Sequence, residues 1–518
     1  MRTGVPSFDV RTACALLAVV VCAAGAARAA IYEVGPGQPL AAIGDVPWAS
    51  LAPGDEVRIH WRAQPYREKW VIGRAGTAAA PIVVRGIEGP GGERPIISGD
   101  GATTPDPLDF TNDQRGVIKI GTSNVPPNTL PAYIEIAGLD VRSAHPSYSF
   151  TDDQGVVRTY TNNAAAIYVE RAQHLVIRDC VLSDSGNGLF IGAFDGDTRD
   201  IEVEGNRIFG NGNVGSAFEH NTYTAAIGIV YEANRFGPLR AGAGGNNLKD
   251  RSAGLVVRYN WIEGGNRQLD LVDAEDSDVI VNDPSYGRTF VYGNVLIEPD
   301  GAGNSQIVHY GGDSGATAIY RKGVLHFFHN TLVSLRSGNT TLLRLSTDDE
   351  HADVRNNVLY VSASGSRLAM LDADGVLALS HNWTKPGWVG SHGTLSAVID
   401  DDGTGVTGTS PGFVDLALQD FHLLETSQAV DAGGALHPDA IPDHEPALQY
   451  LEHQMLEPRA DEGAPDLGAY ALPEPGVGTG LAAGFIALAS LSRRRNRWSH
   501  ASSAMPAPSR TPRAGSGR

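Results

Sequence analysis

The fold is decided by a phrase that recurs between Ile201 and Thr384: alternating apolar residues, then asparagine, one further residue, and an aliphatic or aromatic one. Its copies are IEVEGNRIF (201–209), GIVYEANRF (228–236), LVVRYNWI (255–262), TFVYGNVLI (289–297), VLHFFHNTLV (324–333), ADVRNNVLY (352–360) and LALSHNWT (377–384). Earlier copies have Leu139 and Cys180 where the asparagine stands. Alternation with a period of two predicts β-strands, and a repeat of 25 to 36 residues without helical patterning predicts a solenoid.

We call the repeated asparagines the marker asparagines: Asn206, Asn234, Asn260, Asn294, Asn330, Asn357 and Asn382. Asparagine suits a tight bend, because it tolerates a left-handed backbone and can hydrogen-bond its neighbours. We therefore expect these residues to form one column, with successive coils about 4.8 Å apart. The predicted fold is a right-handed, single-stranded parallel β-helix of roughly ten coils.

Composition limits the function classes. The 518 residues are 42% hydrophobic with a net charge of −19, which excludes a disordered or collagen-like chain. Only 5 of the 40 basic residues are lysine, and basic runs are confined to the extreme C-terminus, so we expect no nucleic-acid partner. An acidic protein repels polyanions at long range, so a site for an acidic polymer must be locally basic or hold a metal.

Both ends of the chain have the pattern of targeting segments. Residues 1–30 combine two early arginines, an apolar stretch and an Ala-Arg-Ala motif, which predicts a secretory signal peptide; an uncleaved anchor is the alternative. At the other end, Pro473-Glu474-Pro475, an apolar stretch and a cluster of arginines resemble the PEP-CTERM sorting signal. That resemblance implies processing by an exosortase-type enzyme; an ordinary membrane anchor is the alternative. We expect a secreted or cell-surface protein.

These features divide the chain into a signal peptide (1–30), a β-helix domain with an N-terminal cap (31–470), a sorting or transmembrane segment (471–497) and a disordered tail (498–518). Four stretches of the middle part resemble secreted right-handed β-helix proteins of the pectate lyase-like superfamily: residues 61–70, 81–101, 410–433 and 465–470. The resemblance implies the fold, and the segment before Pro81 is expected to cover the N-terminal end. This fold hosts lyases, hydrolases and adhesins, so the resemblance is weak for the reaction.

One face of the coils is predicted to be rich in polar side chains. Glu219, Asn221 and Tyr223 follow Asn206 by 13, 15 and 17 residues, and Asn247, Lys249 and Arg251 follow Asn234 by the same offsets. Asp273 and Glu275 continue the series after Asn260, and His309 follows Asn294 by 15. Equal offsets place residues in register and on one face. A slip of one residue would bring His220, Asp270 or Tyr310 onto that face.

The block GNNLKDRSAGLVVRYNWIEGG (245–265) resembles the catalytic coils of β-helix polysaccharide lyases, the chondroitinase B and alginate lyase group. In that group a lysine on one coil and an arginine on the next flank the sugar. Lys249 matches the lysine, while Arg258 and Arg251 are competing matches for the arginine. The lyases commonly hold calcium with acidic side chains, so Ca²⁺ is the cofactor that the resemblance implies, although those acids have no clear counterpart in this sequence.

A lyase removes the C5 proton of a uronic acid, which requires a cation beside the carboxylate and a base within reach. We expect Lys249 to be the base, with its pKa lowered by a neighbouring arginine, and Arg251 to neutralise the carboxylate. Tyr223 or His220 would protonate the leaving oxygen. Further residues are expected to contact the substrate, an acidic or neutral extracellular polysaccharide: Glu219, Asn221, Asn247, Arg258, Asp270, Asp273, His309 and Tyr310.

Two other functions stay open at this point. A glycoside hydrolase or epimerase on the same fold would use paired carboxylates, for which Asp270, Asp273, Glu275 and Asp276 are candidates. A non-catalytic protein would bind or support exopolysaccharide, and its polar residues would be the ordinary solvated face of a solenoid.

Overall fold

A computed structural model describes residues 29–472, apart from 107, 110, 124–126, 128, 453, 461 and 462. Nearly all of the predicted signal peptide and sorting segment, and the whole tail, lie outside the described residues. Within the described part of the chain, no helix has the length and apolar character needed to cross a membrane.

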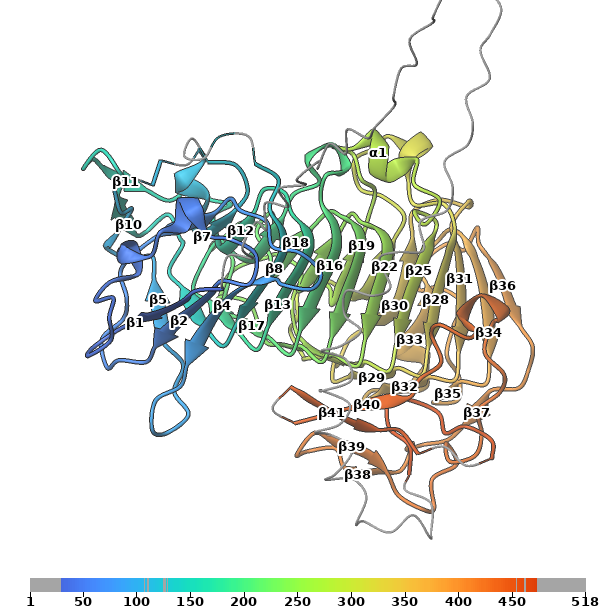
Figure 1. Ribbon diagram of the computed structural model, residues 1–518. Coiled ribbons are helices and arrows are strands. Elements are labelled where there is room, and N and C mark those ends of the chain that lie inside the picture. Colours follow the sequence, from blue (N-terminus) through green and yellow to red (C-terminus); the bar gives the residue numbers. More distant parts are fainter. Residues whose placement is uncertain are drawn as a thin grey trace, which may run out of the picture.

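Three long sheets of parallel strands form the body of the molecule (Figure 1). In the described residues, sheet I has thirteen strands: β1 (Ile31–Val34), β2 (Glu56–His60), β4 (Ile82–Ile87), β8 (Ala132–Ala137), β13 (Gln173–Arg178), β16 (Arg199–Glu204), β19 (Ile227–Glu232), β22 (Ala253–Arg258), β25 (Arg288–Tyr292), β28 (Val324–Phe328), β31 (His351–Arg355), β34 (Val376–Ser380) and β36 (Val398–Asp401).

Sheet II has eleven described strands: β5 (Ile96–Ser98), β9 (Asp140–Arg142), β14 (Val181–Ser183), β17 (Arg207–Phe209), β20 (Arg235–Phe236), β23 (Trp261–Glu263), β26 (Val295–Glu298), β29 (Thr331–Ser334), β32 (Val358–Val361), β35 (Trp383–Thr384) and β37 (Val406–Thr407). Sheet III has ten: β3 (Trp70–Ile72), β7 (Gly116–Ile120), β12 (Ala165–Val169), β15 (Asn187–Ile191), β18 (Thr222–Thr224), β21 (Leu248–Asp250), β24 (Leu269–Leu271), β27 (Gln306–Tyr310), β30 (Thr340–Leu345) and β33 (Leu368–Leu371).

The remaining described elements are short. They are strands β6 (Ala102–Thr103), β10 (Ser149–Thr151), β11 (Val157–Thr159), β38 (Phe413–Asp415), β39 (Asp420–Leu423), β40 (Leu448–Leu451) and β41 (Met455–Pro458), and helices α1 (Asp278–Val281), η1 (Ile43–Asp45), η2 (Trp48–Ser50), η3 (Asp113–Arg115), η4 (Phe194–Gly196), η5 (Thr317–Ile319), η6 (Gly365–Arg367) and η7 (Pro438–Ala440).

In each central coil the chain passes from sheet I through sheet II to sheet III and then returns to sheet I one step further along. The inward side chains of all three sheets form one continuous apolar core. The predicted parallel β-helix is thus confirmed.

The marker asparagines form the predicted column at the turn between sheets I and II. From Asn234 to Asn382, the Oδ1 atom of each accepts hydrogen bonds from the backbone N–H and the Nδ2 of the asparagine one coil earlier, at 2.8 to 3.1 Å. Oδ1 of Asn206, the first of the column, accepts the backbone N–H of Cys180 at 2.9 Å. The Nδ2 groups also donate to backbone carbonyls, as from Asn234 to Val203 at 2.8 Å. Because these side chains are buried, the column satisfies polar groups that water cannot reach.

The left-handed residue of this turn is the one before the asparagine, not the asparagine itself as expected. At the positions preceding the marker asparagines, φ lies between 49° and 66°, at Gly205, Ala233, Tyr259, Gly293, His329, Asn356 and His381. The asparagine therefore contributes hydrogen bonds to the turn, and its neighbour contributes the bend.

The segment before Pro81 contributes strands to the solenoid. Strands β1 and β2 begin sheet I, and β3 begins sheet III. The Trp48 ring of η2 stacks on Trp70 of β3 at 5.3 Å between ring centroids, and both rings are buried. These residues therefore add coils and part of the core at this end.

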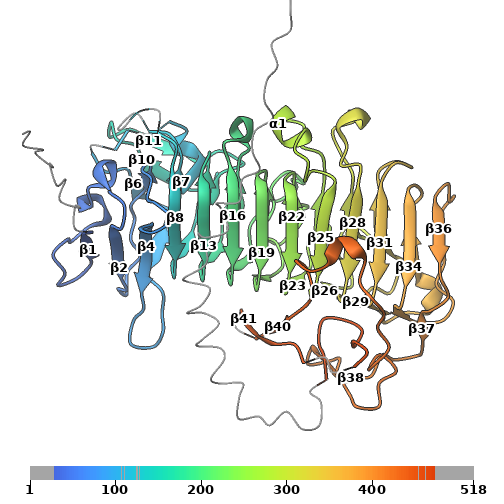
Figure 2. The ribbon, with the colours of Figure 1, turned by 45° about the vertical axis from the view of Figure 1, so that its right-hand side comes forward.

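The C-terminal segment leaves the solenoid after β37 and packs along its outside (Figure 2). Its two antiparallel hairpins, β38–β39 and β40–β41, share an apolar cluster with sheet II that includes Trp261, Trp383 and Phe421. Ala440 of η7 packs with Phe290 and Phe328 of sheet I. Residues 410–433 and 465–470, which resemble the closing phrases of a β-helix, therefore form an outer layer here and not further coils.

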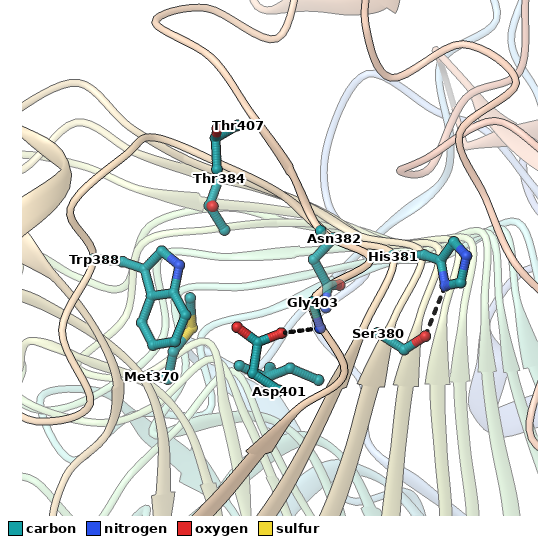
Figure 3. A pocket seen from close by; sticks show the side chains of 11 residues that line it. Met370, Ser380, His381, Asn382, Thr384, Trp388, Asp401, Gly403 and Thr407 are labelled. Atoms are coloured by element: carbon teal, nitrogen blue, oxygen red, sulfur yellow. Dashed lines mark hydrogen bonds between the residues drawn. The ribbon is translucent and has the colours of Figure 1, made fainter.

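The last coils surround a pocket whose lining residues include Met370, Asn382, Trp388 and Asp401 (Figure 3). Asn382 is the last marker asparagine. Near it, Asp401 accepts a hydrogen bond from the Gly403 N–H at 3.1 Å, and Ser380 pairs with His381 at 2.7 Å. This pocket lies where the asparagine column ends.

Replacement of a central marker asparagine should destabilise the whole solenoid. Asn260→Ala removes the Oδ1 that accepts the backbone N–H of Asn234 and the Nδ2 that donates to the Tyr231 carbonyl, so both backbone groups lose this partner inside the core. Because each buried polar group left unpaired costs about 1–3 kcal/mol, we expect the free energy of unfolding in urea to fall by at least that amount. Asn282→Ala, at an exposed position, is the control and should change it little. Equal stability of the two variants would contradict the structural role of the column.

Candidate functional site

A row of polar and aromatic side chains crosses the outer face of sheet III. Strand pairing places Tyr223 beside Lys249, Lys249 beside Asp270, Asp270 beside His309, and His309 beside Arg344. We call these five residues the charged row. The residues that alternate with them, such as Leu248, point into the core.

The dense face exists, but its expected register is only partly correct. Lys249 and His309 both follow their marker asparagine by 15 residues and do share the row. Tyr223 joins at an offset of 17 and Asp270 at 10, because the connections from sheet II to sheet III have different lengths: 210–221, 237–247 and 264–268. Asp270, which was expected on this face only after a slip of one residue, does lie on it, but its offset is five residues shorter than that of Lys249.

Lys249 lies at the centre of the row with its side chain 9% exposed. Its Nζ is 3.1 Å from Oδ2 of Asp270 and also pairs with Oδ2 of Asp313. Asp313 belongs to the loop 311–320, which we call the Asp313 loop, and its side chain is 32% exposed. Lys249 is therefore held between a buried and a more accessible carboxylate.

Arg251 lies two residues beyond Lys249 and joins the same cluster. Its Nε donates to the Tyr223 hydroxyl at 2.8 Å, and its Nη2 lies 2.9 Å from Oδ1 of Asp313 and 2.9 Å from Glu275. The carboxylate of Asp313 thus bridges Lys249 and Arg251, one oxygen to each cation.

The sequence analysis did not identify Asp313. It did identify Asp273, whose side chain holds the Asp313 loop. Oδ1 of Asp273 accepts the backbone N–H of Asp313 at 2.8 Å, and Oδ2 pairs with the Ser314 hydroxyl. Asp273 is fully buried and therefore positions the loop. The signal that could have drawn attention to Asp313 is the Gly311-Gly312 pair directly after the strand that contains His309; Gly311 has a φ of +129°.

Charge pairing decides the protonation states in the cluster. Burial lowers the pKa of Lys249, but the carboxylates of Asp270 and Asp313 outweigh it and raise the pKa above the usual lysine value. Burial raises the pKa of Asp270, but His309 and Lys249 together hold it well below its usual range. The expectation that a neighbouring arginine lowers the pKa of Lys249 enough for it to act as a base is therefore wrong, because two carboxylates face the ammonium group.

His220 and Tyr223 lie together at one end of the cluster, with ring centroids 5.8 Å apart. Burial, aided by Lys249, lowers the pKa of His220 to about 3, so this imidazole is neutral. Its Nδ1 accepts the Asn246 backbone N–H at 2.8 Å, which leaves the ring proton on Nε2. Burial raises the pKa of Tyr223, although Arg251 and Lys249 oppose it. Both groups can therefore donate a proton to a hydrogen bond.

Asp270 and His309 continue into a third side chain, Ser346, which the sequence analysis also missed. Nδ1 of His309 is 2.8 Å from Asp270, and its Nε2 is 2.9 Å from the Ser346 hydroxyl. Burial lowers the pKa of His309, so it is neutral. The Ser346 oxygen also accepts the Gly312 N–H at 2.9 Å, which connects it to the Asp313 loop.

On the other side of the cluster the row continues as aromatic rings. Phe190 stacks on Tyr223 with 5.3 Å between centroids and 8° between planes, and Tyr168 follows at 5.6 Å from Phe190. The Arg115 guanidinium lies 4.8 Å and 4.7 Å from the centroids of Tyr168 and Phe190. Such a surface combines ring faces with a cation.

Several predicted substrate-binding residues lie away from the charged row. Tyr310 points into the core, since it alternates with His309 on β27. Asn221 and Asn247 hydrogen-bond each other in the interior and are fully buried. Glu219 is buried in the connection before β18, and its Oε2 has no hydrogen-bond partner among the described residues.

Arg258 belongs to sheet I, where it pairs with Glu232 at 2.5 Å and donates to the Tyr292 hydroxyl at 3.2 Å. It lies at the opposite end of its strand from the sheet III connection, on the side covered by the C-terminal segment. Of the two competing arginine matches, Arg251 is the one that contacts the Lys249 cluster.

The carboxylates of the cluster do not fit a calcium site. Oδ1 of Asp270 is bound to His309 and its Oδ2 to Asn246 and Lys249, and the oxygens of Asp273 hold the Asp313 loop. A calcium ion needs six to eight free oxygen ligands. Calcium stays a prediction from the resemblance.

Similarity to known proteins is found among solved structures. No protein-family model and no curated protein matches the sequence. Among solved structures, an alginate lyase from Paenibacillus sp. str. FPU-7 is 13% identical with a TM-score of 0.40, over 64% of this chain and 92% of its own. The pectate lyase Pel9A is 11% identical with a TM-score of 0.39, over 86% and 96%. XylC in complex with xylose is 10% identical with a TM-score of 0.41, over 72% and 86%. We draw nothing about substrate or reaction from these similarities.

The ionised state of Asp270 should make the protein sensitive to acid. Because the folded-state pKa lies below the unfolded value of about 3.9, its contribution to stability is present above that pH and is lost as the pH falls below it. We expect the urea midpoint of the wild type to decline between about pH 5 and pH 3, and that of Asp270→Asn to decline less steeply. Asp400→Asn, at an exposed position, should follow the wild type. Parallel profiles for all three proteins would contradict the ion-pair assignment.

Proposed function

We propose that the protein is an exported enzyme that cleaves a uronic-acid-containing polysaccharide by β-elimination at the charged row. In this reaction the C5 proton of the uronate is removed, a double bond forms between C4 and C5, and the bond from C4 to the glycosidic oxygen breaks. The leaving oxygen takes up a proton. The barrier is high until the carboxylate next to C5 is neutralised.

One observation supports this proposal above the others: a carboxylate already bridges Lys249 and Arg251. The Asp313 oxygens pair with Nζ of Lys249 and, at 2.9 Å, with Nη2 of Arg251. A uronate carboxylate has the same shape and charge. Because Asp313 is on a surface loop while both cations are buried, a sugar carboxylate can replace it without moving the cations.

Because the pKa values of Lys249 and Arg251 are raised, both side chains stay protonated. They are therefore suited to neutralise the substrate carboxylate and not to abstract a proton. Tyr223 is then the proton-transfer group best placed, because its hydroxyl already contacts Arg251 and lies beside Lys249 in the row. The two cations favour its phenolate form, whereas burial and Asp276 oppose it. His220, with its proton on Nε2, is suited to hold the leaving oxygen or a sugar hydroxyl.

A glycoside hydrolase is less well supported by the same cluster. Its general acid must stay protonated near neutral pH, which requires a carboxyl with a raised pKa. Asp270 and Asp313 both have lowered values, because each pairs with Lys249. The stacked rings of Phe190 and Tyr223 suit sugar faces in either reaction or in simple binding.

Replacement of either Lys249 or Arg251 should strongly reduce the turnover of uronate polymers. For Lys249→Ala and Arg251→Lys we expect kcat/KM to fall by about 10²–10³-fold. Lys249→Ala removes charge stabilisation, and the ammonium group of Arg251→Lys cannot contact both the Tyr223 hydroxyl and the carboxylate as the guanidinium does. Asp313→Asn should instead lower KM, because it removes the internal competitor for the cations. The measurement is the absorbance of unsaturated products from a panel of uronate polymers.

Lys385→Ala is the matched control, because this lysine contacts backbone carbonyls on the sheet II side of the solenoid. It should keep wild-type activity. Cleavage by Lys249→Ala at the wild-type rate would overturn the proposal, as would saturated products from the wild type, which would indicate hydrolysis.

A second candidate function rests on a different observation, the chain Asp270–His309–Ser346. A carboxylate on Nδ1 and a hydroxyl on Nε2 of one imidazole is the connectivity that activates a serine for acyl transfer. Extracellular polysaccharides are a source of ester groups. The alternative role of Ser346 is to anchor the Asp313 loop through Gly312.

Ser346→Ala separates these two roles. An esterase predicts that release of acetate from an acetylated polysaccharide falls by at least about 10³-fold. A loop anchor predicts unchanged acetate release and, because Asp313 is displaced, altered KM in the lyase assay. Absence of acetate release from the wild type would rule the esterase out.

A further inference from the structure

A cluster of metal-binding side chains lies outside the charged row, where the C-terminal segment crosses sheet I. One ligand atom each from His326, His437 and Asp439 lies within 4.8 Å of the other two. His326 belongs to β28, whereas His437 directly precedes η7 and Asp439 lies within it, more than a hundred residues later in the chain. Among the described residues, this is the one group of three or more such side chains whose ligand atoms are close enough to share an ion.

The buried side chain of His326 gives a second, independent indication of a metal ligand. The residue is 1% exposed, and neither ring nitrogen has a hydrogen-bond partner among the described residues. Its ring stacks on Phe290 at 4.9 Å and lies 4.8 Å from the His437 ring, which fixes its orientation. Buried imidazoles normally satisfy at least one nitrogen, so this side chain lacks a partner of the kind that a metal ion provides.

The geometry points to a zinc-type transition-metal site formed by His326, His437 and Asp439, which fastens the C-terminal segment to the solenoid. Nε2 of His326 lies 3.8 Å from the Asp439 carboxylate, and that carboxylate lies 3.9 Å from Nδ1 of His437. Ligand atoms about 2.0–2.2 Å from a tetrahedral ion are closer together than this, so an ion would draw the three side chains together and take the place of the Asp439 N–H, which Nδ1 of His437 accepts at 3.2 Å.

The donor set selects the class of ion. Two imidazole nitrogens and one carboxylate suit Zn²⁺, Co²⁺ or Ni²⁺, whereas Ca²⁺ and Mg²⁺ prefer oxygen ligands. The side chains of His437 and Asp439 are 34% and 52% exposed, which gives an ion access and leaves a position for water. The site is separate from the charged row, so the inference does not depend on the proposed reaction.

The position of the cluster indicates what the ion would do. The segment around η7 is hydrogen-bonded to the solenoid at both ends, through Gly434 to Asn356 at 2.8 Å and through Ala447 to the Tyr259 hydroxyl at 3.2 Å. Between these points Ala440 is buried against sheet I. An ion at His326 would fix the middle of the segment.

The test is Zn²⁺ titration of the full-length protein, purified without a histidine tag, by calorimetry. We expect the wild type to bind one equivalent of Zn²⁺ tightly at this site. In Asp439→Asn the Zn²⁺ affinity of the site should fall at least about tenfold. His326→Phe keeps a ring against Phe290 and should lose the site. Asp443→Asn, an exposed acid on the same segment, is the matched control and should bind as the wild type does.

Two further readouts keep the outcome unambiguous. Co²⁺ should give the intense visible absorption of a tetrahedral site in the wild type and the control, and not in Asp439→Asn. Zn²⁺ should slow proteolysis between Gly434 and Ala447 in the wild type, but not in Asp439→Asn or His326→Phe. Wild-type Zn²⁺ affinity in both Asp439→Asn and His326→Phe, or a Co²⁺ spectrum of the octahedral aquo type, would overturn the proposal.

Discussion

Beyond the ladder hydrogen bonds of the three sheets, successive central coils are joined at one turn, where the side chain of a marker asparagine accepts two hydrogen bonds from the asparagine of the preceding coil. This contact requires a fixed backbone path between sheets I and II, with a left-handed residue followed by asparagine. Variation in coil length is therefore absorbed elsewhere, mainly in the connections that lead into and out of sheet III. The charged row lies on that sheet.

The division of the coil explains which predictions from the sequence succeeded. Strand alternation and the asparagine repeat lie on sheets I and II, where hydrogen bonding enforces one geometry, so fold and column could be predicted from local pattern. Tyr223 and Asp270 lie beyond connections of unequal length, so a fixed offset could not give their register. Asp313 and Ser346 come from connections of sheet III, and their approach to Lys249 and His309 depends on tertiary contacts alone.

The same limit applies to the chemistry of Lys249. The sequence shows a lysine near an arginine, and that pair alone would lower the lysine pKa. The carboxylates that reverse this effect are 21 and 64 residues away in sequence. Arg258 illustrates the converse: it is close to Lys249 in sequence, yet lies on another sheet because the chain passes from sheet III to sheet I between them. The role of a residue depends on the sheet on which it lies. The resemblance of a short block of sequence to a family does not show which sheet that is.

The cluster also addresses how an acidic protein could accept an acidic polymer. Lys249 and Arg251 are both nearly buried, so each needs a counter-charge when no ligand is bound. Asp270 supplies a permanent one from within the sheet. Asp313 supplies an exchangeable one from a surface loop, so the cluster is close to neutral when free and gains positive charge when Asp313 moves away. In the proposed reaction a substrate carboxylate would replace a carboxylate of the protein, and the binding energy would have to exceed only the difference between two similar ion pairs. Such a site would discriminate by the fit of the sugar against Tyr223 and Phe190 more than by charge.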